Sequence, residues 1–236
     1  MNSWLAAYQR RGKALGFYDG LIDGEYGPAS ERMFSAVFAV AEKAKGIRPP
    51  LFPQLDPKYR FLLDLTPLPL IVHEGLKLLG TIETPGPGNS PVIMGWKNEL
   101  LAAGRDDVKG FTADSIPHCG LGIAIMAFRA GKDISPVPNV LWARDWLKFG
   151  VPVDEPMLGD IAVWPRGSGG HVNMVIALDP AGYVHGLGAN QSDAVNIMRK
   201  HRDQALGFRR PAYRNMPATV RQYIVQPNGQ ISTREA

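Results

Sequence analysis

The spacing of apolar residues changes from a helical repeat to a strand-like pattern near residue 150. Before that point, apolar side chains recur every three or four positions, which predicts helices. The helical segments are 68–79, 91–103, 115–130 and 139–149. After that point, β-rich runs over 159–178 and 183–190 are separated by turn residues. The pattern favours an α+β fold in which helices come first and an antiparallel sheet of about four or five strands follows.

The helix expected over 115–130 carries Cys119, the only cysteine of the chain, in its first turn. Ser115 is a suitable N-cap, Pro117 suits a first turn, and Gly131 closes the helix. A thiol there feels the positive end of the helix dipole and lies beside free backbone N–H groups, which lowers its pKa. On this position alone, the alternative is a small buried core residue, as free cysteines usually are.

A histidine and an asparagine downstream favour an activated thiol over a buried core residue at position 119. The segment 159–178 is predicted to form a hairpin whose second strand opens at His171, and the strand over 183–190 ends at Asn190. Asn190 can therefore lie level with His171. Cysteine hydrolases need a thiolate, an imidazole that shuttles its proton, and a polar group that fixes the imidazole tautomer. The order Cys119, His171, Asn190 supplies all three.

The third position of this set has alternatives. Gln191 and His185 lie on or beside the same strand, and a one-residue change of register would exchange which side chain faces the imidazole. Asn190 is favoured because its amide oxygen accepts the imidazole N–H without adding charge. His118, directly before the cysteine, either donates near an oxyanion or only covers the helix face, and the second reading is favoured.

Several motifs between Leu76 and Pro211 occur in a familiar order. They are "GTIETPGPGNSPVI", "DSIPHCGLGIA", "LWARDWLKFG", "GDIAVWPRGSGGHVNMVIAL" and "LGANQSDAVNI". With them the chain resembles a bacterial and phage family within the CHAP/NlpC-type superfamily of papain-like cysteine hydrolases. The resemblance implies a papain-like catalytic domain that cleaves amide bonds in peptidoglycan, with Cys119 as nucleophile, His171 as base and Asn190 as the orienting residue. His118 departs from the pattern, because relatives often carry an aromatic residue there.

The first 46 residues have the pattern of a separate helical module. Helical spacing over 2–15 and 29–45 encloses the turn-rich run "GFYDGLIDGEYGP". An EF-hand would need an oxygen ligand at Leu21 and Glu at Ser30, so a calcium loop is excluded. The run is similar to the loop of three-helix peptidoglycan-binding domains, and the alternative is a helical hairpin that only packs on the enzyme. The wall-binding candidates are Tyr18, Asp19, Asp23 and Tyr26.

Proline and glycine positions divide the chain into four parts. The expected parts are the module at 1–46, a Pro-rich linker at 47–65, the catalytic domain at 66–214 and a tail at 215–236. Within the catalytic domain, Trp142 and Trp146 fall four residues apart on one predicted helix. Such a pair can line a sugar groove, but the spacing is more typical of a buried helix face.

Composition and charge limit the remaining choices. A net charge of +4 favours approach to an anionic envelope, and the scattered basic residues do not indicate a nucleic-acid site. One cysteine excludes an internal disulfide, and no cofactor or zinc signature is present. The N-terminus lacks an apolar signal segment and no stretch reaches membrane-spanning length. We therefore expect a monomeric phage or prophage enzyme, made in the host cytoplasm, that reaches the wall after holin-type release.

Three rival functions stay open at this level. The enzyme could cut the sugar–peptide amide, as an N-acetylmuramoyl-L-alanine amidase does, instead of a peptide–peptide bond. It could be a cysteine transferase of the transglutaminase kind, for which Asp would be preferred as the third residue. It could also be a non-catalytic virion or wall-binding protein that retains the fold.

Overall fold

The computed structural model describes residues 55–226 and, before them, residues 6, 9–10, 13, 18–23 and 29–30. A six-stranded antiparallel sheet with the order β1-β6-β2-β3-β4-β5 is its central element. The strands are β1 (Val151–Val153), β2 (Ile161–Arg166), β3 (Gly169–Leu178), β4 (Tyr183–Gly188), β5 (Asn196–His201) and β6 (Gly207–Arg210). The α+β prediction is confirmed, and the sheet has one strand more than the expected upper number.

The α-helices between residues 55 and 226 come before the sheet in the chain, as the apolar spacing predicts. In this part of the chain they are α3 (Phe61–Asp64), α4 (Leu70–Leu78), α5 (Pro91–Ala102) and α6 (Cys119–Arg129). The 3-10 helices are η2 (Pro57–Tyr59), η3 (Asp106–Gly110), η4 (Ala143–Lys148) and η5 (Arg202–Gln204). None of the helices in the described part of the chain is long and apolar enough to cross a lipid bilayer.

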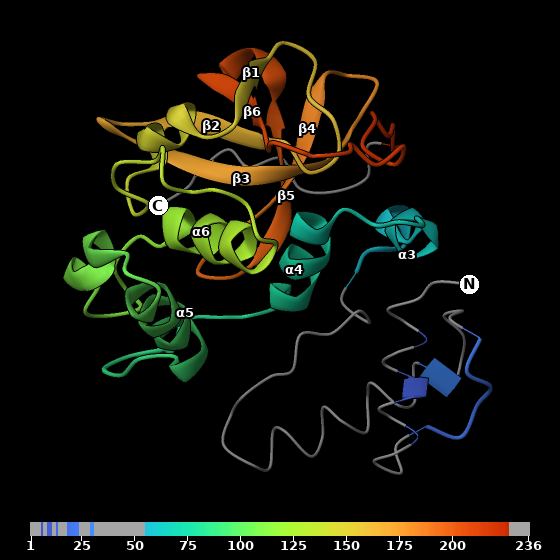
Figure 1. Ribbon diagram of the computed structural model, residues 1–236, viewed down its shortest axis with the longest axis horizontal. Coiled ribbons are helices and arrows are strands. Elements are labelled where there is room, and N and C mark those ends of the chain that lie inside the picture. Colours follow the sequence, from blue (N-terminus) through green and yellow to red (C-terminus); the bar gives the residue numbers. More distant parts are fainter. Residues whose placement is uncertain are drawn as a thin grey trace.

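Helices α4, α5 and α6 lie on one side of the sheet, with α6 nearest to β3 (Figure 1). Residues 119–127 of α6 are all buried. A helix that is apolar all round belongs in a core, and α6 is the centre of the main one. A smaller apolar cluster around Trp164, Val175 and Phe208 is separate from it.

Two of the expected limits fall within packed structure. Residues 57–64, assigned to the linker, form η2 and α3, and Tyr59 and Leu62 are buried because they pack into the main core. The tail is also packed up to residue 226: Val225 donates to the Leu178 carbonyl at the end of β3 and is itself buried. The packed body therefore extends beyond the limits expected at 66 and 214.

The helix predicted over 139–149 is wrong in its first half. A turn precedes η4, and Trp142 occupies the N-cap position with extended backbone. The physical reason is that side chains take over the hydrogen bonds at this point: Asn139 Oδ1 accepts from Leu141 N and Asp145 Oδ2 accepts from Asn139 N. Trp142 and Trp146 consequently do not share one helix face.

Helix α6 approaches its neighbours closely through two glycines. A Cβ on Gly120 would lie 2.2 Å from the Val140 carbonyl oxygen, and one on Gly122 would lie 2.5 Å from the Ala189 Cβ. The first contact is with backbone, which cannot rotate away as a side chain can. The start of α6 is thus in direct contact with the loop before η4 and with the segment after β4.

We predict that Gly120→Ala destabilises the protein by roughly 1–3 kcal/mol, the usual cost of overpacking a core. Gly95→Ala is the matched control, since it is also a helical glycine but has nothing within 4 Å of the added Cβ. Gly95→Ala should stabilise by about 0.5–1 kcal/mol through helix propensity. Urea unfolding measures the change in the free energy of unfolding for each variant. A change of the same sign in both variants would contradict the close approach of Val140.

A buried polar network joins η2 to the sheet. Asp179, in the turn after β3, accepts from Arg199 Nε at 2.9 Å and lies 3.3 Å from His185 Nε2. Tyr59 Oη lies 2.6 Å from His185 Nδ1. Burial alone would raise the pKa of Asp179, but hydrogen bonds from the Tyr183 amide, Arg199 and His185 outweigh it and hold the pKa below its ordinary value. Burial lowers the pKa of His185, which stays neutral between Tyr59 and Asp179.

We expect Asp179→Asn to lower the free energy of unfolding by about 3 kcal/mol at neutral pH, because Arg199 then loses its buried anionic partner. A depressed carboxyl pKa contributes stability that is complete above the ordinary value of 3.8 and is lost as pH falls below it. The difference in the free energy of unfolding between variant and wild type should therefore become smaller when urea unfolding is measured near pH ~3. The exposed carboxylate of Asp203 provides the control, and an equal loss in Asp203→Asn would contradict the role of burial.

Candidate active site

Cys119 is the first residue of α6, and its side chain is buried with 3% of its surface exposed. The helix begins four residues later than the sequence suggests, with His118 at the N-cap position, so Ser115 does not cap it. Residues 113–116 form a turn in which Ile116 N donates to the Ala113 carbonyl, and the proline at 117 disfavours helical backbone at Ile116. The first N–H groups of a helix have no intrahelical acceptor, so Cys119 lies at an electropositive end as expected.

His171 lies on β3, opposite Trp164 of β2, and is completely buried. Its Nε2 atom is 3.0 Å from Gln191 Oε1. Gln191 Oε1 also accepts from Asn173 Nδ2 at 3.1 Å, and Asn173 Oδ1 accepts from Trp164 Nε1 at 2.9 Å. The imidazole therefore belongs to a chain of buried amides and an indole that continues into β2.

Hydrogen bonds from its amide nitrogen fix the orientation of the Gln191 side chain. Its Nε2 atom donates to the Asn196 carbonyl at 2.7 Å and to Asn196 Oδ1 at 3.0 Å. The amide nitrogen thus points to Asn196, and only the oxygen Oε1 can face His171. Since Oε1 is an acceptor, His171 Nε2 carries the proton and Nδ1 is the basic nitrogen of the neutral ring.

Asn190 makes no hydrogen bond to the imidazole, so the contact expected of it is not formed in the structure. Its Nδ2 atom donates to Glu83 Oε1 at 3.0 Å. Extending the register of the Met174–Leu187 pair would place residue 190 opposite His171, but β4 ends at Gly188. Asn190 then adopts a φ of 54°, a left-handed conformation that Asn tolerates better than most residues. The chain turns out of the sheet there, and the next side chain, Gln191, reaches the histidine.

The sequence itself indicates why Gln191 reaches the histidine in place of Asn190. In the pair Asn190–Gln191, the residue suited to a left-handed turn precedes a residue with an equivalent but longer amide. Of the two alternatives considered for the third position, Gln191 makes the contact. His185 does not, because it is held between Tyr59 and Asp179 in the network described above.

Three consecutive residues join the cysteine end of α6 to the histidine. Ala189 packs against Gly122 of α6, Asn190 binds Glu83, and Gln191 binds His171. Glu83 Oε1 in turn lies 3.5 Å from Nδ1 of His118, the residue before Cys119. The segment 189–191 therefore contacts the first turn of α6 and the imidazole directly, and it is linked to His118 through Glu83.

The surroundings of Glu83 favour the neutral form of its carboxyl group more than water at the protein surface does. Burial raises the pKa of Glu83, the nearby Asp193 and Asp114 carboxylates raise it further, and the Asn190 hydrogen bond opposes them. Burial likewise lowers the pKa of His118, although a hydrogen bond to the Ile116 carbonyl opposes this. His118 packs near the rings of Trp96 and Phe111 and makes no side-chain capping bond.

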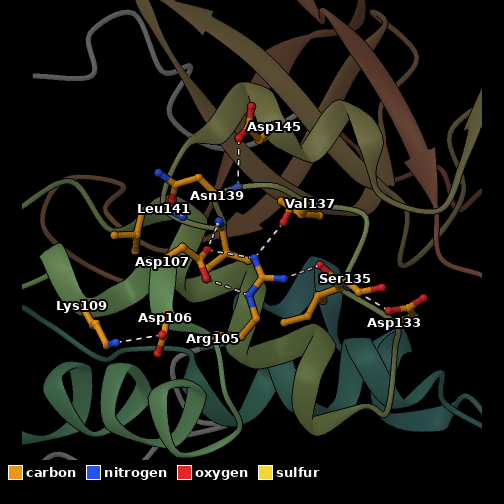
Figure 2. A network of polar contacts seen from close by, with 12 residues as sticks. Arg105, Asp106, Asp107, Lys109, Asp133, Ser135, Val137, Asn139, Leu141 and Asp145 are labelled. Carbon is orange, nitrogen blue, oxygen red and sulfur yellow. Dashed lines mark hydrogen bonds and ion pairs between the residues drawn. The ribbon is translucent and has the colours of Figure 1, made fainter.

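An ion pair from outside α6 holds the loop between α6 and η4 in place. Figure 2 shows the Arg105 guanidinium against the Asp107 carboxylate, with bonds of 2.9 Å to both oxygens. Arg105 also donates to the Val137 carbonyl, and Asp107 Oδ2 accepts from Val140 N at 2.7 Å. This pair, which the sequence analysis missed, fixes the Val140 carbonyl over Gly120, next to Cys119.

The candidates of the amino-terminal module are only partly described. Tyr18 is buried and its hydroxyl donates to the Leu21 carbonyl, so this ring takes part in local packing. Asp19 is exposed, and Asp23 Oδ1 accepts from Gln9 Nε2 at 2.8 Å. Tyr26 lies outside the described residues. Wall binding by these residues stays a prediction.

A cavity of about 390 Å³ lies beside the site but does not include Cys119 or His171. Lys58 and Tyr59 line it on one side and Ser192 and Met198 on another. Asn196, which orients Gln191, also lines it. Among the residues that the structure describes, no group of three or more His, Cys, Asp or Glu side chains is arranged to hold a metal ion.

Comparison of the chain with protein-family models, with curated proteins and with solved structures finds no match. The function is therefore argued from the side chains and their contacts.

We predict that Gln191→Ala slows alkylation of Cys119 by iodoacetamide more than Asn190→Ala does, at pH values below the ordinary thiol pKa of about 8.5. Gln191 fixes the histidine tautomer, whereas Asn190 contacts Glu83. The expected loss for Gln191→Ala is roughly tenfold to a hundredfold, part of the ~10²–10⁴-fold that a positioned acid–base group contributes. A larger loss in Asn190→Ala at equal thermal stability would show that Gln191 is not the orienting residue.

Proposed function

We propose that this chain is a cysteine hydrolase of the CHAP/NlpC type, with a papain-like catalytic domain, that cleaves an amide bond in the peptide part of peptidoglycan. The observation that carries the proposal is the buried hydrogen bond between His171 Nε2 and Gln191 Oε1. It leaves Nδ1 as the basic nitrogen. The same 189–191 segment packs on the helix whose first residue is the single cysteine.

The first half of the reaction forms a thioester. His171 Nδ1 takes the proton of the Cys119 thiol, and the sulfur attacks the carbonyl carbon of the scissile amide. Backbone N–H groups at the start of α6 stabilise the oxygen that becomes negative, because they have no intrahelical acceptors. His171 then protonates the amide nitrogen, the C–N bond breaks, and the amine leaves.

The second half restores the enzyme. A water molecule gives a proton to His171 Nδ1 and its oxygen attacks the thioester carbonyl. The C–S bond breaks, the acid product leaves, and the proton returns to the sulfur. Throughout, Gln191 keeps Nε2–H bonded, so the ring changes charge without changing orientation.

The neutral third residue supports hydrolysis over the transglutaminase-like alternative. That alternative is expected to use a carboxylate against the imidazole, whereas Gln191 is an amide bound to a second amide, Asn173. A neutral partner orients the ring without fixing it as a cation. We retain endopeptidase and N-acetylmuramoyl-L-alanine amidase activities as two forms of the proposal, since both break an amide of the same stem peptide.

The location proposed for this activity is the bacterial cell wall. A net charge of +4 favours association with an anionic envelope, and the amino-terminal module would add binding to intact wall. The proposed setting is that of a phage lysis enzyme which reaches its substrate after a holin opens the membrane.

The decisive experiment is digestion of purified sacculi by wild type, Cys119→Ala and His171→Ala, followed by zymography and mass spectrometry of the released muropeptides. Wild type should clear the wall, and both variants should lose turnover because they remove the nucleophile and the base. The mass of the products identifies the amide that is cut.

Two results would contradict the proposal. Clearing by Cys119→Ala at the wild-type rate would exclude thioester chemistry. Binding of all three proteins to sacculi with no product from any of them would instead support the non-catalytic wall-binding alternative.

A further inference from the structure

The two tryptophans that share one predicted helix have opposite environments. Trp146 is completely buried and its Nε1 donates to the Val140 carbonyl at 3.1 Å. Trp142 has 50% of its surface exposed. Among the exposed large apolar side chains in the described part of the chain, Trp142 is the only aromatic one. A tryptophan usually buries most of its large apolar area, so this exposure is unusual.

The backbone that carries Trp142 is held in place by hydrogen bonds on both sides. Trp142 N donates to the Asn139 carbonyl at 3.0 Å, and Asp145 N donates to the Trp142 carbonyl at 3.0 Å. Asn139 N bonds to the Asp145 carboxylate, as Figure 2 shows. The exposed indole therefore extends from a preorganised turn, and binding through it would not require that turn to be ordered first.

Trp142 lies between two residues that contact the elements carrying Cys119 and His171. Two residues before it, the Val140 carbonyl packs on Gly120 beside Cys119. Two residues after it, Arg144 Nε donates at 2.6 Å to the Gly169 carbonyl, two residues before His171. The indole is thus attached to a loop that touches both the start of α6 and the start of β3.

Three polar residues lie close to Trp142 in the chain. Asn139 is exposed, Arg144 and Asp145 are half-buried, and all three lie within three residues of Trp142. One polar atom of each residue is already bonded within the described part of the chain, and an apolar protein surface would leave the remaining ones, Asn139 Nδ2, the terminal nitrogens of Arg144 and Asp145 Oδ1, without hydrogen-bond partners. A pyranose ring suits them better, because its C–H face stacks on an aromatic ring while its rim carries hydroxyl and acetamido groups.

We propose that Trp142 is a sugar-stacking residue and that the preferred substrates are stem peptides still joined to their amino sugar. The inference rests on the proposed peptidoglycan hydrolase function and narrows its substrate class. Trp142 contributes binding of the sugar and takes no part in bond cleavage. Its loss should therefore change KM with little change in kcat, and only for substrates that carry the sugar.

The kinetic test compares a disaccharide-linked stem peptide with the same peptide freed of its sugar. Trp142→Ala should raise KM for the linked substrate roughly tenfold, and Trp142→Phe should recover most of that loss, because one aromatic contact is worth about 0.5–1.5 kcal/mol. KM for the free peptide should stay unchanged. Val151→Ala, which removes an equally exposed apolar side chain on edge strand β1, should alter neither substrate.

A binding test separates this inference from the proposed catalysis. In the Cys119→Ala background, the indole N–H signal of Trp142, assigned by its absence in Trp142→Phe, should shift on titration with N-acetylglucosaminyl-N-acetylmuramic acid. If wild type cleaves neither peptide, the hydrolase proposal fails and the titration alone decides the sugar site. An indole signal that the disaccharide leaves unmoved, or an equal rise of KM on both peptides, overturns the inference.

Discussion

The candidate site depends on one buried primary amide that must satisfy hydrogen bonds at both ends. Gln191 is completely buried, so each unpaired polar atom would cost about 1–3 kcal/mol. Its nitrogen is committed to Asn196 and its oxygen to His171 and Asn173. Reversing the amide would place a donor against a donor at Asn173 and an acceptor against an acceptor at Asn196. The amide therefore imposes one orientation on itself and one tautomer on the histidine.

The same constraint explains why the turn before Gln191 has the shape it does. A strand that continued past Gly188 would present residue 190 to the histidine, and the next side chain would point to the opposite face. Leaving the sheet through left-handed residues at 190, 192 and 193 allows Gln191 to turn inward while Asn190 reaches Glu83. One tight segment thereby supports both the imidazole and the residue before the cysteine.

The cysteine end is positioned by close backbone packing. Gly120 admits the Val140 carbonyl, and the Arg105–Asp107 pair fixes that loop from outside the helix. Since Arg105 bonds two oxygens of one carboxylate and also loop carbonyls, its geometry is more restricted than that of a single surface ion pair. The loop that results also bears Trp142, so the exposed indole and Cys119 are positioned by the same loop.

The sequence by itself determined most helices and strands and the positions of two residues of the candidate site. Apolar spacing predicts α4 and α5 closely, turn residues delimit the hairpin of β2 and β3, and both Cys119 and His171 lie on the expected elements. The sequence also predicted an amide as third member, but the choice between Asn190 and Gln191 depended on where β4 stops pairing, which is a property of the sheet and its neighbours. The exposure of Trp142 and the Arg105–Asp107 pair were likewise decided by tertiary contacts, because side chains distant in sequence compete there with the hydrogen bonds of a regular helix.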